Sequence, residues 1–211
     1  GNVIDPLMLI DEFGVDSVRY YLMAEMVLGL DATFSMDSFV KKYNSDLAND
    51  LGNLAQRSLS MIFKNCDGVM PKSSDHSDAD NEILAALDGL LPKVREYMDV
   101  QAFNKALETI WKVVSEENGN IAGEEQWALK KNDPERMGTV LYTTAEIIRQ
   151  IGIIIQPIMP ESAAKLLDLL KIPDDERGFS QLGSENRLAS GIEMEKPEGV
   201  FPRYVAGKTN E

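Results

Sequence analysis

Apolar residues recur every three or four positions along most of the chain, which is the period of amphipathic helices. The clearest example is a long helix predicted from Ser35 to about Lys64. Its apolar stripe consists of Phe39, Tyr43, Leu47, Leu51 and Leu54. No segment alternates strictly between apolar and polar residues, as a half-buried strand would. The pattern therefore predicts an all-α protein.

Capping and helix-breaking residues divide the rest of the pattern into further helices. Asp5-Pro6 and Asp133-Pro134 each place an N-cap aspartate before a proline at the first helical position. We expect Gly14 to end the first helix, and Pro92 to kink or break the helix that contains it. Besides the long helix, the pattern predicts helices over about 6–13, 16–26, 79–97, 99–119, 134–155 and 161–170. Together they predict an antiparallel bundle of about five helices, preceded by a short helical connecting unit.

Changes in composition divide the chain into three parts. We predict a connecting helical unit over residues 1–34, a helix bundle over 35–175 and a C-terminal tail over 176–211. The tail is poorly periodic and punctuated by Gly and Pro, which is typical of irregular structure. Its Val200-Phe201-Pro202 run is apolar, so we expect the tail to be partly docked on the body of the protein.

Charge and cysteine content restrict the possible surroundings. The formal net charge of −14 argues against a general nucleic-acid binder, so any contact with RNA must come from a local site. The most apolar run, Ile147 to Met159, is too short and too polar to span a membrane. Cys66 is the only cysteine, which rules out an intrachain disulfide and fits a reducing compartment. We therefore expect a cytoplasmic protein without membrane contact.

The sequence offers few groups for catalysis or metal binding. His76 and Cys66 are the only residues of their types, which excludes the common zinc sites and nucleophile–histidine arrangements. The adjacent acids Glu116-Glu117 and Glu124-Glu125 are more typical of solvated loop charge than of a catalytic pair. We therefore predict no catalytic residue, no metal and no cofactor in this chain.

The polar side of the long helix is rich in amides, unlike an ordinary solvated face of Glu and Lys. Asn53 and Arg57 lie one turn apart there, so their side chains can converge on one planar ligand. Amide and guanidinium groups are suited to hydrogen bonds with the edges of nucleic-acid bases. The alternative is a polar surface pair with Arg57 bridged to Asp50, and spacing alone favours that alternative. Trp111 lies in an apolar stripe and is expected in the core.

Several motifs resemble those of known enzymes. Gly1-Asn2-Val3-Ile4-Asp5-Pro6 and the segment from Gly14 to Leu22 resemble class I aminoacyl-tRNA synthetases just after their Lys-Met-Ser-Lys-Ser loop. The segment from Asn44 to Arg57 is similar to the first long helix of the anticodon-binding domain in the methionyl-tRNA synthetase family. Three further motifs resemble the same family. They are Phe103-Asn104-Lys105-Ala106-Leu107, Asn118 with Trp127, and Ile155-Gln156-Pro157-Ile158-Met159-Pro160. The resemblance extends over nearly the whole chain.

The resemblance implies a role in recognition. Residues matching Asn53, Arg57 and Trp127 contact the CAU anticodon in this family, with the tryptophan stacking on a base. It also implies a full-length parent that joins methionine to tRNA using ATP. This chain lacks the Lys-Met-Ser-Lys-Ser and His-Ile-Gly-His motifs and should be inactive alone. The implied partners are methionine-specific tRNA and the parent's own catalytic domain, and a monomer is expected.

Two departures from the family pattern affect Trp127. Asn120 replaces the usual tyrosine, and Gln126 replaces the usual proline before the tryptophan. A different interpretation makes Trp127 a hydrophobic plug at the end of the bundle. The alternative for the whole chain is a free-standing acidic helical domain that binds protein partners, which would also explain the net charge.

Overall fold

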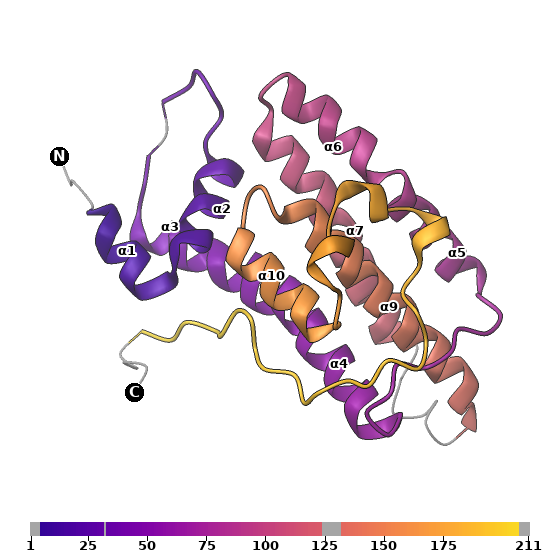
Figure 1. Ribbon diagram of the computed structural model, residues 1–211. Coiled ribbons are helices and arrows are strands. Elements are labelled where there is room, and N and C mark those ends of the chain that lie inside the picture. Colours follow the sequence, from indigo (N-terminus) through magenta and orange to yellow (C-terminus); the bar gives the residue numbers. More distant parts are fainter. Residues whose placement is uncertain (1–4, 32, 124–131, 207–211) are drawn as a thin grey trace.

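The computed structural model describes residues 5–31, 33–123 and 132–206. These residues form helices and irregular connections, with one isolated antiparallel bridge between Val69 and Glu193 and no strand. The predicted all-α class is confirmed. Figure 1 shows a bundle of long helices with a small helical unit packed against one end of it. Among the described residues, no helix combines the length and apolarity needed to cross a bilayer.

The connecting unit contains α1 (Pro6–Phe13) and α2 (Val15–Glu25), joined by Gly14. The Asp5 carboxylate accepts a hydrogen bond of 2.9 Å from the backbone N–H of Leu7, which confirms the predicted N-cap. Gly14 has a φ of 79°, a left-handed value that favours glycine and ends α1 as predicted.

One arginine ties this unit to the bundle. Arg19 on α2 donates from Nε to the carbonyl oxygen of Ile158 at 2.7 Å and from Nη2 to that of Pro157 at 2.8 Å. Both acceptors lie in the turn that follows α9 (Pro134–Ile155). The fixed guanidinium fork therefore holds two parts of the chain that are far apart in sequence.

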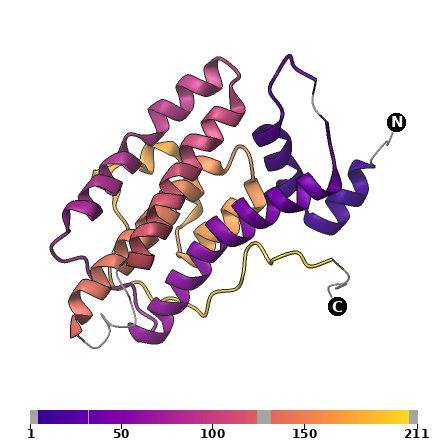
Figure 2. The same cartoon turned by 180° about the vertical axis from the view of Figure 1, so that it is seen from behind.

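The long predicted helix is present as three consecutive segments. These are α3 (Met36–Lys42), the π-helix η1 (Tyr43–Gly52) and α4 (Asn53–Asn65). Ser35 caps the first turn by accepting from the N–H of Ser38 at 3.1 Å. All five residues of the predicted apolar stripe are buried. Figure 2 shows this helix running diagonally across the back of the molecule, from the connecting unit to the far end of the bundle.

The rest of the bundle consists of α5 (Asp78–Asp88), α6 (Leu90–Asp99), α7 (Phe103–Gly123), α9 (Pro134–Ile155) and α10 (Pro160–Leu169). The kinked pair α5–α6 runs back along the bundle before α7 begins, so the long helix and α7 run in the same direction (Figure 1). Hydrogen bonds from Trp111 to Asp46 and from Asn118 to Asp50 follow this parallel pairing. The predicted core position of Trp111 is confirmed, since its side chain is buried.

Three predicted helix ends were wrong. The break between α5 and α6 lies at Gly89, because Pro92 occupies the first turn of α6, where a missing N–H costs no helical bond. Asp99 ends α6 instead of opening the next helix, since Gln101 adopts a left-handed φ of 58°. The next helix, α7, continues beyond Gly119 to Gly123.

The C-terminal tail crosses the long helix and returns to the connecting unit (Figure 1). The tail includes short 3-10 turns at Asp174–Glu176, Phe179–Gln181 and Ser184–Asn186. Phe201 in this tail is buried. Tyr43 donates from its hydroxyl to the carbonyl oxygen of Pro202 at 2.8 Å.

The side-chain amide of Asn44 forms two hydrogen bonds with the backbone of the tail, as a neighbouring strand would. Its Nδ2 donates to the carbonyl oxygen of Tyr204 at 3.0 Å, and its Oδ1 accepts from the N–H of Tyr204 at 2.9 Å. The Tyr204 ring lies 4.7 Å, between centroids, from the ring of Phe13 in α1. The tail therefore joins the long helix to the connecting unit.

Candidate functional site

Asn53 and Arg57 occupy consecutive turns at the start of α4, on the side away from the buried stripe. The Arg57 side chain is exposed and that of Asn53 is half-buried. Neither side chain forms a hydrogen bond or ion pair with any of the described residues. Two planar hydrogen-bonding groups are therefore presented side by side and remain available to a ligand.

The alternative bridge between Arg57 and Asp50 is not formed, because Asp50 is bound to α7 instead. Ser115 donates to its Oδ2 at 2.8 Å, and Asn118 donates from Nδ2 to its Oδ1 at 2.5 Å. Burial raises the pKa of the Asp50 carboxyl group, although both hydrogen bonds oppose that shift. Asp50, whose carboxylate was the alternative partner of Arg57, is therefore bound to α7 and not to Arg57.

Asp50 also connects α7 directly to Asn53. The carbonyl oxygen of Asp50 accepts from Nδ2 of Asn118 at 3.3 Å and from the backbone N–H of Asn53. Asn118 was singled out in the sequence as a family motif residue, but its contact was not foreseen. In the structure it fixes the backbone from which the candidate face of α4 begins.

The π-helix η1 was not predicted, although its apolar spacing carries a signal. From Phe39 to Leu51 the residues of the apolar stripe are separated by four positions throughout. In an α-helix, which turns through about 100° per residue, three such steps would rotate the stripe by about 120°. The wider turns of η1 keep all of these side chains facing the core. They also leave the carbonyl of Asp46 to accept from Nε1 of Trp111 at 2.9 Å.

Trp127, the third predicted site residue, lies outside the described residues. The segments that flank it are described: α7 ends at Gly123, and α9 begins at Pro134 after the N-cap Asp133. Asp133 accepts from the N–H of Arg136 at 2.9 Å, as its predicted capping role requires. Both flanks lie at the end of the bundle towards which α4 runs (Figures 1 and 2).

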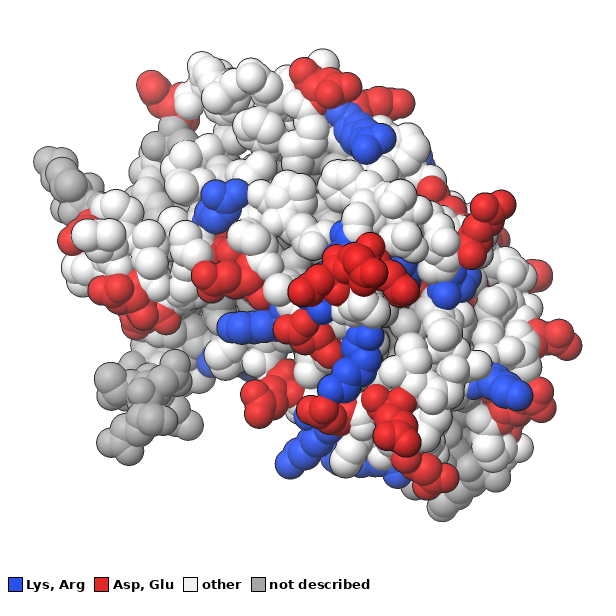
Figure 3. Space-filling model, viewed as in Figure 1, with Lys and Arg blue, Asp and Glu red and all other residues white. Residues whose placement is uncertain are grey.

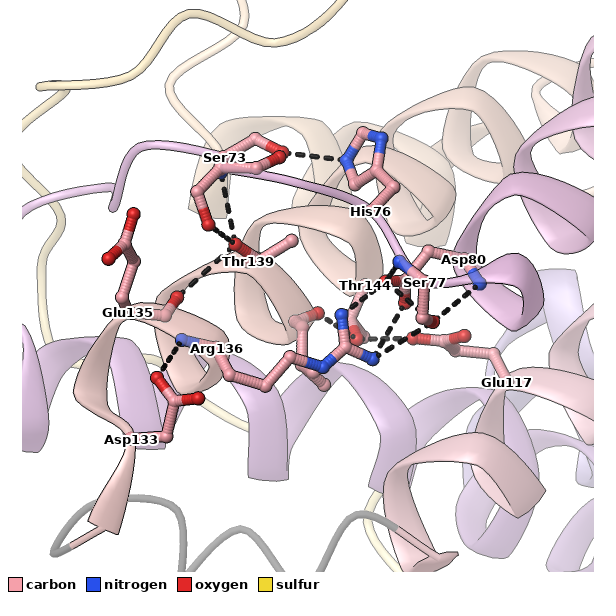
Figure 4. Close-up of polar contacts among 12 residues, drawn as sticks. Ser73, His76, Ser77, Asp80, Glu117, Asp133, Glu135, Arg136, Thr139 and Thr144 are labelled. Atoms are coloured by element: carbon pink, nitrogen blue, oxygen red, sulfur yellow. Dashed lines mark hydrogen bonds and ion pairs between the residues drawn. The ribbon is translucent and has the colours of Figure 1, made fainter.

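A polar cluster at this end of the bundle escaped sequence reasoning (Figure 4). Arg136 on α9 is paired with Asp80 on α5 and donates to the hydroxyl of Ser77 at 3.2 Å. Ser77 and Asp80 form the capping box of α5. Burial alone would raise the pKa of Asp80, but the bonds from Arg136 and Ser77 lower it. His76, in the preceding loop, bonds to Ser73 at 2.6 Å.

One acidic residue was wrongly assigned from sequence. Glu117 was expected to carry solvated loop charge, but it lies on α7 with only 2 % of its surface exposed. Its neighbour Glu116 is exposed, as expected. The two adjacent glutamates therefore occupy opposite environments, because consecutive helical residues point about 100° apart.

One cavity of the structure lies away from the candidate face. A cavity of about 270 Å³ lies between the connecting unit, α10 and the tail, and its lining includes Asp16, Tyr43 and Lys165 but neither Asn53 nor Arg57. Within the described part of the chain, no three His, Cys, Asp or Glu side chains gather as a metal site would require. The candidate site is therefore an open helix face, suited to an extended or splayed ligand.

Charge is mixed on one face of the molecule. On the face seen in Figure 3, Asp and Glu are interspersed with Lys and Arg, without a continuous basic surface among the described residues. Such a surface supplies little general attraction to phosphates. On this face, contacts at individual side chains would have to provide most of the binding energy for a nucleic acid.

Comparison with known proteins follows these geometric findings. Residues 70–210 match the family described as the anticodon-binding domain of methionyl tRNA ligase, and residues 1–59 match the class I tRNA synthetases (M). Methionine–tRNA ligase of Rhizobium meliloti (strain 1021) is 52% identical over 206 residues, covering 98% of this chain and 40% of the relative. That of Mycobacterium leprae is 47% identical over 208 residues, covering 97% and 38%.

Solved structures agree. Mycobacterium tuberculosis methionyl-tRNA synthetase bound by methionyl-adenylate superimposes with a TM-score of 0.92 at 45% identity, over 96% of this chain and 40% of that one. Its apo form gives a TM-score of 0.91. The chain thus spans about 40% of the length of the curated relatives it matches. Since the anticodon-binding domain match alone covers more than half of the sequence, the chain belongs to the methionyl-tRNA ligase family.

Proposed function

We propose that this chain recognises the CAU anticodon of methionine-specific tRNA through the outer face of α4. The observation that carries the proposal is the exposed Arg57, one turn after Asn53, with the nearby Asp50 carboxylate bound by α7 instead. The family match supports the same role. The comparisons give no support to a free-standing protein-interaction domain.

The proposed chemistry combines hydrogen bonding with stacking. Unpaired loop bases expose their Watson–Crick edges, which amide and guanidinium groups can bond in a plane. Asn53 and Arg57 would make these bonds, and Trp127 would stack on the first anticodon base. Stacking of this kind contributes on the order of 1–3 kcal/mol per base.

The proposal extends to the full-length protein. We propose that it joins methionine to tRNA using ATP, as the names of its relatives imply. The present chain, without the two ATP-handling motifs, would be inactive alone and would bind no cofactor. We divide it into a connecting unit (1–34), the anticodon-binding bundle (35–175) and a tail (176–211). We further propose a monomeric, cytoplasmic protein.

Exposed apolar side chains in the N-terminal part of the chain support contact with a catalytic domain. Large apolar side chains are exposed in α1, in and after α2, and at the start of α3, where a soluble surface would usually be polar. These residues are Leu7, Met8, Leu22, Val27, Leu28, Leu30 and Met36. We propose that this surface packs against the class I catalytic domain of the same protein.

Binding of an anticodon stem-loop RNA tests the recognition role. The wild-type chain should prefer a stem-loop with CAU in its loop over one with a scrambled loop. Arg57→Lys keeps the charge but removes the planar fork, so affinity should fall about tenfold or more. Asn53→Ala should have a similar effect. Arg203→Ala, which removes an exposed charge on the tail, should leave affinity nearly unchanged.

Stability separates a binding defect from a folding defect. Because Arg57 is exposed and unpaired among the described residues, its substitution should change the free energy of unfolding by less than about 0.5 kcal/mol. In the full-length enzyme, Trp127→Ala should reduce aminoacylation. Equal affinity of Arg57→Lys and wild type for the CAU stem-loop would refute the assigned site.

A further inference from the structure

Glu117 is a buried acid near the end of α7 that the proposed function does not use. Its side chain faces α9, where the Thr144 hydroxyl donates to Oε1 (Figure 4). Asn120, one turn further along α7, also forms a side-chain hydrogen bond with it. A carboxyl group with 2 % of its surface exposed is costly to ionise unless a cation compensates it.

The surrounding charges do not fully compensate an ionised Glu117. Asp80 faces it from α5 and repels a negative charge, whereas Arg136 faces it from α9 and attracts one. Arg136 is already paired with Asp80 and bonded to Ser77. Burial, followed by repulsion from Asp80, therefore raises the pKa of Glu117 to about 7 against the opposing hydrogen bonds and Arg136.

Asn118, the next residue of α7, connects this helix to the candidate site through Asp50. Asn118 donates to the Asp50 carboxylate and to the Asp50 carbonyl oxygen, which also accepts from the backbone N–H of Asn53. Glu117 and Asn118 share one helical turn but face different neighbours, α9 and η1. A shift of this turn away from α9 must therefore move the contact that fixes the start of α4.

We propose that Glu117 is a positioning residue for anticodon-loop binding, and that its uncharged form holds the last turns of α7 against α9 so that Asn118 fixes Asp50 and Asn53. The inference rests on the proposed function. When Glu117 ionises, its charge is accommodated by water entering between α7 and α9 or by Arg136 moving from Asp80. Either response displaces the turn that carries Asn118.

The test is the pH dependence of affinity for the CAU stem-loop RNA between about pH 6 and pH 8. For the wild-type chain, the dissociation constant should increase about fivefold or more as pH rises, with a midpoint near neutrality. Glu117→Gln retains the shape and hydrogen-bonding capacity but cannot ionise, so it should bind with the low-pH affinity throughout. Any titration of the RNA or of other groups is common to all variants.

Two further variants test whether the pH dependence of binding comes from Glu117. Glu116→Gln removes the same charge from the adjacent, exposed position and should retain the wild-type pH profile. Thr144→Val removes a hydrogen bond that favours the ionised carboxylate, so the midpoint should move to higher pH. A Glu117→Gln profile that parallels wild type, or an unmoved midpoint in Thr144→Val, would overturn the inference.

The same data distinguish the two proposals. If the wild-type chain shows no preference for CAU at any pH, the proposed function fails. If it binds CAU, and Arg57→Lys weakens that binding while Glu117→Gln leaves the pH profile unchanged, only the positioning role of Glu117 fails.

Discussion

Whether a side chain at this site is available to a ligand depends on what its neighbours already bind. Arg57 can serve a ligand because Asp50, the acid that would otherwise pair with it, receives hydrogen bonds from Ser115 and Asn118. This division of partners joins residues separated by more than 60 positions, so no local pattern reveals it. The spacing of Asn53 and Arg57 was sufficient to propose a shared ligand, whereas their lack of competing partners required coordinates.

Glu117 should make the stability of the protein depend on pH in an unusual direction. Its pKa is raised from 4.5 to about 7 on folding, so the folded state binds more protons between these values. Stability should therefore fall as pH rises from about 4.5 to 7, by at most about 3 kcal/mol. Urea unfolding of Glu117→Gln should show a gain of this order over wild type at pH 8 and little gain near pH 4.

The exposed neighbour supplies the control for that measurement. Glu116→Gln should change the free energy of unfolding by less than about 0.5 kcal/mol at either pH. Identical pH dependence of stability in wild type and Glu117→Gln would show that the buried carboxyl group does not control it.

Among the elements, most helix starts were predictable, although Asp99 did not open α7, and helix ends were less so. Asp5, Ser35 and Asp133 act through contacts two or three residues away, which a sequence displays directly. The end of α6 depends instead on the left-handed backbone of Gln101, a residue type that gives no such signal. The π-helix was also missed. Its only sequence signal is an apolar stripe that repeats every four residues for several turns, which an α-helix could not keep on one face.

Gly52 allows the tail to approach the long helix. A Cβ atom at this position would lie 3.2 Å from Cβ of Phe201 and 2.6 Å from the carbonyl oxygen of Leu47. Gly52→Ala should therefore destabilise the protein by about 1–3 kcal/mol and increase protease cleavage in the tail. In contrast, Gly119→Ala on α7 meets no atom within 4 Å and should stabilise the protein by about 0.5–1 kcal/mol.

Thermal unfolding of the two alanine variants checks this pair of opposite effects. Both substitutions remove one glycine from a helix, so they share the change in helix propensity and differ in packing. Stabilisation by Gly52→Ala would mean that Phe201 does not rest against the long helix in solution.

At the scale of the molecule, the fold class and the family were predictable, whereas the interior polar contacts were not. Arg136 and Asp80 pair across 56 positions, and the capping box that contains Asp80 gives no sign of which cation it meets. Periodicity predicts which residues become buried apolar core, but it cannot show that an acid such as Glu117 is enclosed with them. The acidity of the chain, in contrast, predicts how the affinity for RNA depends on salt.

The net charge of −14 implies that recognition depends weakly on salt. Each neutralised phosphate contributes a slope of about −0.7 to log affinity against log salt for single-stranded RNA. We expect a slope between about −1 and −2 for the CAU stem-loop, and Arg57→Gln should change that slope little, because Arg57 is proposed to bond a base and not a phosphate. Fluorescence titration at several salt concentrations measures both values. A wild-type slope steeper than about −4 would indicate an extended phosphate interface instead.

The return of the tail to α1 has a practical consequence for single-molecule work. Phe13 and Tyr204 are in ring contact, so both ends of the described chain emerge on the same side of the molecule (Figure 1). Arg57 lies roughly 30 Å along the long helix from its first turn. A surface anchor or fluorophore fused at either terminus should therefore leave the α4 face unobstructed.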